Sequence, residues 1–229
     1  DGVPARGFLC GKRVVVATDG GRLRERRPAQ HGRKRSKTGH RRYDAPWREP
    51  KLLTIYVIGE DGKVSDEFEP VYDGTLGDAD AIFEMILGYL KALGAHQARE
   101  LIILGDGARW IWDRVTPLVE RLGIDALRVK QVIDFCHAVG TLHAIAEARV
   151  SWSATERELW IRMAKKLLKR GAIDDVVEMI DSLAIGRRAK DISEHREYFV
   201  RNKERMQYAS FRKANVPTGS GAIESAIRR

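Results

Sequence analysis

The chain has 229 residues, 43% of them hydrophobic, and its 41 Lys and Arg residues exceed its 32 Asp and Glu residues, for a formal net charge of +9. Ten of the basic residues and one acidic residue fall between Arg22 and Arg42, which leaves 31 of each sign elsewhere. These numbers exclude a chain that is disordered throughout and a uniformly basic, histone-like chain. A neutral globular body with one basic segment predicts a polyanionic partner at one place.

The first half of the chain alternates between β-branched apolar runs and turn residues. The first strand ends at Asp19-Gly20-Gly21, and the basic segment after it contains Gly and Pro without periodicity. The sequence therefore predicts, in order, a strand over 13–18, a loop or extended arm over 22–42, a strand over 52–58, its antiparallel return over 64–72 after a turn at 60–63, and a helix over 78–93.

The second half continues this alternation and then becomes purely helical. It predicts a strand over 101–104, a helix over 108–122, a strand over 127–133, a helix over 134–148, helical segments over 156–169, 174–183 and 190–211, and a last helix that begins near Ala222. The expected fold class is α/β, a mixed sheet flanked by helices. We divide the chain into a core (1–150), an all-helical insertion (151–214) and a final core helix (215–229). Because the chain stops inside that helix, we expect it to be a fragment of a longer protein.

Asp19 and Asp106 each end a buried apolar strand and each precede Gly. Acids at the ends of neighbouring strands lie where α/β proteins place ligands, and two close carboxylates stay ionised only beside a cation. Hard oxygen ligands suit Mg²⁺ or Mn²⁺, and two such ions perform phosphodiester chemistry. The alternative is that each Asp-Gly pair only makes a turn after its strand.

Glu224 is a third candidate acid, in the first turns of the last predicted helix. Pro217, Thr218 and two glycines mark the start of that helix, so the carboxylate can project toward the sheet end. The alternative is a favourable acid near a helix N-terminus, paired with Arg228 four residues later. On local grounds alone this alternative is preferred.

Five segments together resemble bacterial insertion-sequence transposases of the ISKra-like group, a part of the DDE class that is related in motif layout to Mutator-type enzymes. The segments are VVVATDGG over 14–21, WREPK over 47–51, GDGARWIW over 105–112, DFCHAV over 134–139 and PTGSGAIESAIRR over 217–229. They occur in the order of that family and extend from Val14 to the last residue. The resemblance implies a ribonuclease H-like catalytic core with an all-helical insertion before the last catalytic helix.

The resemblance also implies a catalytic triad of Asp19, Asp106 and Glu224 that binds two Mg²⁺ or Mn²⁺ ions. Its implied reaction is hydrolysis at transposon ends, followed by attack of the freed 3′-hydroxyl on target DNA, without a covalent enzyme intermediate. Asp134 and His137 resemble an Asp/Cys-x-x-His motif that supports the triad in Mutator-like relatives. A core histidine that caps a strand-to-helix turn is an equal alternative for His137.

The basic segment is expected to contact DNA phosphates rather than bases, because it lacks the pattern of a base-reading helix. Two tryptophans of the helical block, Trp152 and Trp160, are candidates for stacking on a flipped base, although ordinary packing is the preferred interpretation. The cations of the segment are Arg22, Arg24, Arg26, Arg27, Arg33, Lys34, Arg35, Lys37, Arg41 and Arg42.

Competing functions are a nuclease of the same fold, such as a junction resolvase, and a non-catalytic, domesticated DNA-binding protein. A haloacid-dehalogenase-type phosphatase is excluded because Gly21 occupies the place of its second Asp. Cys10 and Cys136 form no metal motif and favour a reducing cytoplasm. No apolar run is long enough for a membrane-spanning helix. The resemblance implies a bacterial protein that acts at the nucleoid. The family pattern implies a homodimer or larger assembly on two DNA ends.

Overall fold

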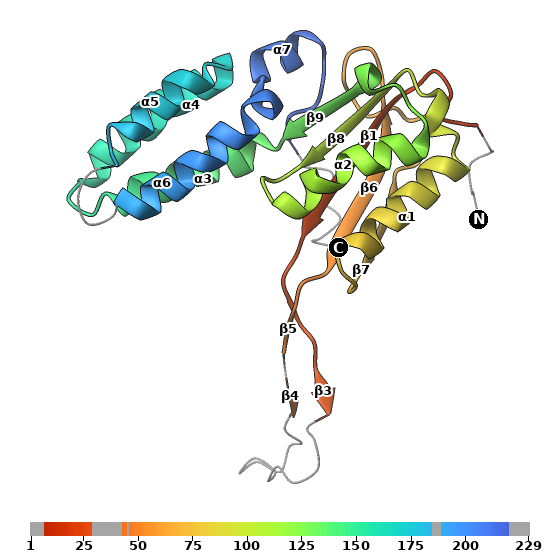
Figure 1. Cartoon of the computed structure of the whole chain (residues 1–229), viewed down its shortest axis with the longest axis horizontal. Helices are drawn as coiled ribbons and strands as arrows, with labels where there is room; N and C mark the ends of the chain where they lie inside the picture. Colours follow the sequence, from red (N-terminus) through yellow and green to blue (C-terminus); the bar gives the residue numbers. More distant parts are fainter. Residues whose placement is uncertain (1–6, 29–42, 45, 185–188, 220–229) are drawn as a thin grey trace.

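Five strands form one mixed sheet in the order β7-β6-β1-β8-β9 in the computed structural model, which describes residues 7–28, 43–44, 46–184 and 189–219 (Figure 1). β1 is antiparallel to β6 and parallel to β8, while β6 and β7 are antiparallel and β8 and β9 are parallel. The strands are β1 (Arg13–Gly20), β6 (Lys51–Ile58), β7 (Val71–Thr75), β8 (Glu100–Gly105) and β9 (Val129–Ile133). The predicted mixed α/β sheet is confirmed.

The central strand β1 is buried on both faces, as its run of Val14, Val15, Val16 and Ala17 predicts. The predicted return strand is displaced, because β7 begins at Val71 rather than at Val64. Val64 makes only an isolated bridge to Ile58. The chain then leaves the sheet so that Phe68 can enter the core and stack on Phe8, with 5.3 Å between the ring centroids.

Two helices cover one face of the sheet, α1 (Ala79–Ala92) and α2 (Arg109–Leu122) (Figure 1). Asp78 caps α1 by accepting a hydrogen bond from the amide of Ala81, as expected at a helix start. The helix α3 (Phe135–Ala148) follows β9 directly. These three helices lie where the sequence predicts them, each to within one residue at both ends.

The helical content predicted over 156–211 is also confirmed, whereas the last predicted helix, from about Ala222, lies outside the described residues. Helices α4 to α6 pack with α3 into a bundle that extends from the β9 edge of the sheet, and a short 3-10 turn, η3, packs on β9 itself (Figure 1). No described helix is long and apolar enough to cross a membrane. The elements are α4 (Ala154–Arg170), α5 (Ile173–Asp181), α6 (Ala189–Asn202), η3 (Lys203–Met206) and α7 (Tyr208–Lys213), and shorter 3-10 turns are η1 (Ala95–Gln97) and η2 (Ala126–Arg128).

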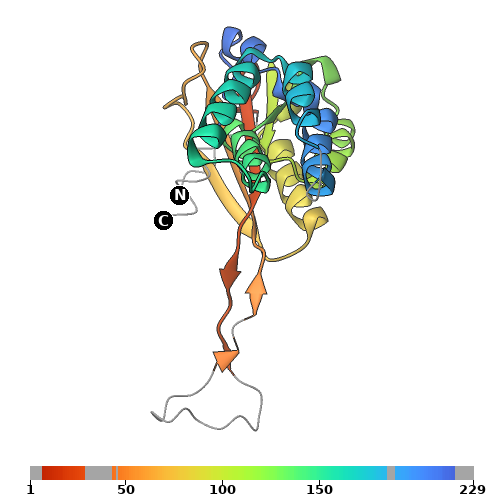
Figure 2. The same ribbon diagram turned by 90° about the vertical axis from the view of Figure 1, so that its left-hand side faces the viewer.

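The described start of the basic segment, 22–28, belongs to an extended two-stranded ribbon, whereas residues 29–42 lie outside the described part of the chain. The ribbon leaves the sheet after β1, returns at β6 and projects away from the body of the protein (Figures 1 and 2). Its antiparallel pairs are β2 (Leu23–Arg24) with β5 (Trp47–Arg48) and β3 (Arg27–Pro28) with β4 (Tyr43–Asp44). The ribbon therefore extends directly from the strand that carries Asp19.

Candidate active site

Three acids follow one another across the carboxyl ends of the parallel strands β1, β8 and β9. Thr18 is in register with Gly105, and Gly105 is in register with Ile133. The next residues along the three strands are Asp19, Asp106 and Asp134. The prediction that Asp19 and Asp106 end neighbouring strands is thus confirmed, and Asp134 extends the row to the edge of the sheet.

Local hydrogen bonds distinguish Asp134 from the other two acids. Its Oδ1 atom accepts from the amides of Cys136 (2.6 Å) and His137 (3.1 Å), so Asp134 caps α3, and it is only 1% exposed. Asp19 and Asp106 each accept one local amide hydrogen bond through Oδ1, from Gly20 (2.7 Å) and Ala108 (2.8 Å). The Oδ2 atoms of Asp19 and Asp106 accept no hydrogen bond from a described residue, which suits them to bind a cation.

The electrostatics of Asp19 are dominated by the burial of its carboxyl group. Burial raises the pKa of the Asp19 carboxyl, His137 lowers it, and the carboxylates of Asp106 and Asp134 raise it further. His137 Nε2 lies 3.9 Å from Asp19 Oδ2, and the His137 side chain is 41% exposed, so this histidine is no core residue. The turn is capped by Asp134 instead, and His137 faces the acids.

The donor set fits a hard divalent cation, because Asp19 and Asp106 offer carboxylate oxygens whose mutual repulsion a cation would relieve. Within the described residues, no three His, Cys, Asp or Glu side chains form a complete metal-binding group. The third predicted ligand, Glu224, lies outside the described residues.

The segment that precedes Glu224 runs toward the acid edge. At the opposite end of the sheet, Arg13 at the start of β1 donates through Nη2 to the carbonyl of Ala214 (2.9 Å). Val216 is then buried, and the Thr218 carbonyl accepts from the amide of Phe135 (2.8 Å), which directly follows Asp134. The described chain therefore reaches the row of acids at Thr218, six residues before Glu224.

Two aromatic residues beside Asp106 were not predicted from the sequence. Trp112 donates through Nε1 to the Asp106 carbonyl (2.7 Å) and is buried. Tyr198 of α6 covers Gly107 so closely that a Cβ atom at Gly107 would lie 1.8 Å from Tyr198 Cε2. Burial, with the charge of Asp106, raises the pKa of the Tyr198 hydroxyl. The helical block thus packs directly onto the loop that carries Asp106.

The ribbon contains an aromatic residue, Trp47, that was also not predicted as a site residue from the sequence. The guanidinium carbons of Arg22 and Arg24 lie 5.4 Å and 4.9 Å from the centre of the Trp47 ring, which is 58% exposed. Arg26 is exposed, and Arg27 belongs to β3. The other predicted phosphate contacts, Arg33, Lys34, Arg35, Lys37, Arg41 and Arg42, lie outside the described residues.

The surroundings of Trp152 and Trp160 favour ordinary packing of these side chains over stacking on a flipped base. Their ring centroids are 6.2 Å apart, Trp160 is buried, and Arg149 lies over the Trp152 ring. Figure 1 shows α4 beginning at the end of the helical block that is remote from the sheet. The start of α4 is therefore remote from the acid row.

Asp19→Asn should make the metal-free protein more stable at neutral pH. The folded-state pKa of Asp19 is raised, so its contribution to stability is present below the unfolded value of 3.8 and is lost as pH rises through the folded value. The ionised group then destabilises the fold, and Asn removes this effect. Urea unfolding in chelator should show a gain for Asp19→Asn at pH 7 that shrinks toward pH 3.8; a gain independent of pH would contradict the interpretation.

Comparisons of the chain with protein-family models, with curated protein sequences and with solved structures found no match.

Proposed function

We propose that this protein is the catalytic domain of a DNA transposase of the DDE class, with a ribonuclease H-like core. The observation that carries the proposal is the row of acids at the ends of β1, β8 and β9, together with a basic ribbon whose first strand begins four residues after Asp19. The five-stranded mixed sheet flanked by helices is compatible with that core. The sequence resemblance supplies the reaction class.

Asp19 and Asp106 would hold two Mg²⁺ or Mn²⁺ ions through their carboxylates, with Glu224 as the third ligand. Such ions activate an attacking oxygen and stabilise the leaving oxygen of a phosphodiester. The hydrogen bonds from Gly20 and Ala108 fix the rotamers of the two aspartates, and the cap that Asp134 forms on α3 fixes the position of His137. His137 is exposed beside Asp19, where it can donate a hydrogen bond to a phosphate oxygen.

DNA is the proposed partner, both as transposon ends and as target. Arg22 and Arg24 lie at the base of the ribbon, within a few residues of Asp19, so phosphates held there would be next to the acids. Because transposition joins two DNA ends to one target, we propose that a homodimer or larger assembly acts on the DNA.

The proposal predicts cleavage and joining that depend on Mg²⁺ or Mn²⁺. The test is a donor plasmid that carries the gene of this protein with its flanking DNA, incubated with the full chain and a second plasmid as target. Cleavage near the gene and products joined to the target are expected with Mn²⁺, and neither with chelator.

The other outcomes identify the alternatives. Metal-dependent cleavage without joined products would indicate a nuclease or resolvase. DNA binding without cleavage in either metal would indicate a non-catalytic DNA-binding protein.

A further inference from the structure

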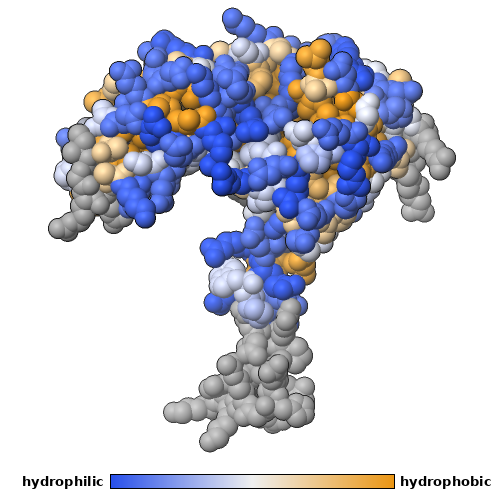
Figure 3. All heavy atoms as spheres, in the orientation of Figure 1, coloured by the Kyte–Doolittle hydropathy of each residue, from blue (hydrophilic) through white to orange (hydrophobic). Residues whose placement is uncertain are grey.

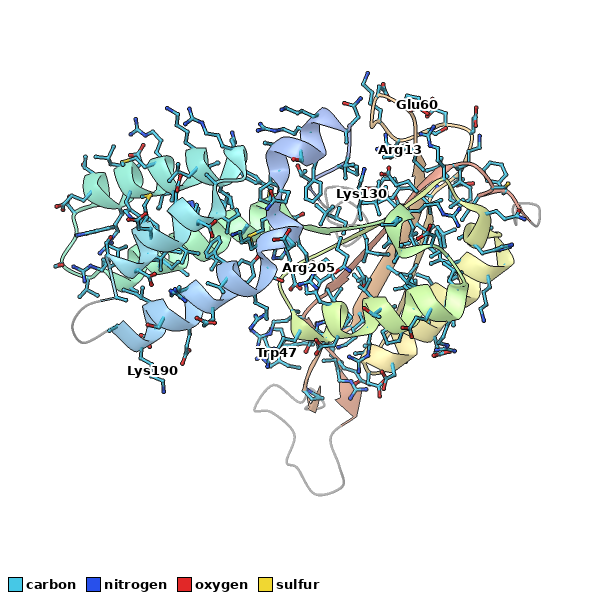
Figure 4. The ribbon with its side chains drawn as sticks, turned by 45° about the horizontal axis from the view of Figure 1, so that its top comes forward. Arg13, Trp47, Glu60, Lys130, Lys190 and Arg205 are labelled. Atoms are coloured by element: carbon cyan, nitrogen blue, oxygen red, sulfur yellow. The ribbon has the colours of Figure 1, made fainter. Side chains whose placement is uncertain are left out.

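A cationic groove lies along the edge strand β9, where the helical block meets the sheet. It has a volume of about 460 Å³. Figure 4 shows Arg205 of η3 and Lys130 of β9 in this junction. Its polar lining consists of Lys130, Gln131, Arg201, Glu204 and Arg205, that is, three cations and one acid.

The two arginines of the groove lack a carboxylate partner within hydrogen-bond distance among the described residues. Arg205 donates through Nε to Gln131 (2.7 Å) and through Nη1 to Asn202 (3.2 Å), and both acceptors are neutral. Arg201 is exposed and makes no hydrogen bond or ion pair with a described residue. Lys130, in contrast, pairs with Glu100. The groove therefore retains positive charge that an anion can neutralise.

Burial and the nearby charge of Arg201 lower the pKa of Arg205, while Asp113 acts in the opposite direction. The repulsion between the two guanidinium groups is relieved when an anion binds between or beside them. Planar guanidinium groups with several N–H donors are well matched to phosphate oxygens.

One buried side chain, Trp112, lies between the groove and the backbone of the candidate active site. Arg205 stacks on Trp112, with 4.7 Å between its guanidinium carbon and the ring centre, and the same indole donates to the Asp106 carbonyl (2.7 Å). Arg201 lies one helical turn from Tyr198, which covers Gly107. Trp112 and Tyr198 thus connect the two arginines of the groove to the loop that carries Asp106.

We infer that the groove binds the phosphate backbone of DNA and forms a second contact surface, separate from the ribbon. The identity of the polyanion rests on the proposed function. Its aromatic lining residue, Phe211, is buried, so the groove offers no exposed ring on which a base could stack. Contacts to phosphates give affinity that is independent of sequence and depends strongly on salt.

The test measures binding of the full chain to a fluorescent duplex of arbitrary sequence, by anisotropy in chelator, between about 50 and 200 mM salt. Each lost phosphate contact should reduce the slope of log affinity against log salt by about 0.9. We expect this reduction for Arg201→Ala and about twice as much for Arg201→Ala with Arg205→Gln. Lys63→Ala changes a cation that lies in the turn after β6, does not line the groove and pairs with Asp61, so it should leave the slope unchanged.

If the double variant unfolds, the single variant Arg201→Ala is sufficient for the test. Arg201 is exposed and has no described partner, so its replacement should not affect folding. A slope equal to that of the wild type, or a wild type that binds no duplex, would overturn the inference. The inference would also be overturned if the double variant no longer bound inorganic phosphate in calorimetry while its slope of log duplex affinity against log salt stayed equal to that of the wild type. If the variants reduce the slope but the wild-type protein cleaves no DNA, only the proposed function is overturned. If the wild type cleaves DNA but the variants leave the slope unchanged, only the inference about the groove is overturned.

Discussion

Asp106→Asn is expected to lower metal-dependent cleavage by at least about 100-fold without unfolding the protein. The Oδ2 atom of Asp106 accepts no hydrogen bond from a described residue, whereas Oδ1 accepts from the amide of Ala108. Asparagine keeps an oxygen for that amide but loses the charge that would hold a divalent cation. Metal ions contribute several kcal/mol to such reactions, and about 3 kcal/mol corresponds to about 100-fold in rate.

Asp125→Asn is the matched control. Asp125 also accepts an amide hydrogen bond two residues along, from Leu127 (2.9 Å), but it precedes β9 at the opposite end of that strand from Asp134. Cleavage by this variant should equal that of the wild type. Binding of a duplex in chelator by Asp106→Asn should be equal or tighter, because a negative charge near the phosphates is removed. Unaltered cleavage by Asp106→Asn would refute the role of this acid.

The positions of Asp19 and Asp106 follow from local sequence because each ends a short, fully buried strand. Once both strands lie in one sheet with parallel register, the two residues become neighbours. Asp134 could be placed in the same way, as the residue between the last strand and its helix. What the sequence predicts well is therefore the part of the site that depends on strand ends.

The contacts of the helical block could not be predicted in this way. Gly107 and Tyr198 meet only because α6 packs on α3 and α5 at a particular angle, and hydrophobic periodicity does not encode that angle. The contact of Arg205 with the Trp112 ring could not be predicted for the same reason, because Arg205 lies in a charged stretch whose sequence does not indicate this neighbour. An extended arm was one of the two alternatives predicted after Asp19, but its strand pairing was not, because its two-residue pairs are too short for an alternating pattern.

Gly107→Ala is expected to destabilise the protein by about 1 to 3 kcal/mol, the usual cost of an additional group in a packed region. Its Cβ atom would lie 1.8 Å from Tyr198 Cε2 and 2.5 Å from Cδ2, so the ring must move away from the Asp106 loop. The measurement is urea unfolding. For a chain of this size, each kcal/mol also corresponds to a decrease in Tm of about 2 to 4 °C.

Two further variants separate this clash from the general effect of alanine. Gly140 lies inside α3, and a Cβ atom there meets nothing within 4 Å, so Gly140→Ala should stabilise the protein by about 1 kcal/mol. Tyr198→Ala removes the ring, and in that background Gly107→Ala should cost little. A double-mutant cycle isolates the difference as a coupling energy between the two positions. If Gly107→Ala destabilises both backgrounds equally, the ring of Tyr198 does not pack on Gly107, and the helical block is not fixed to the Asp106 loop by this contact.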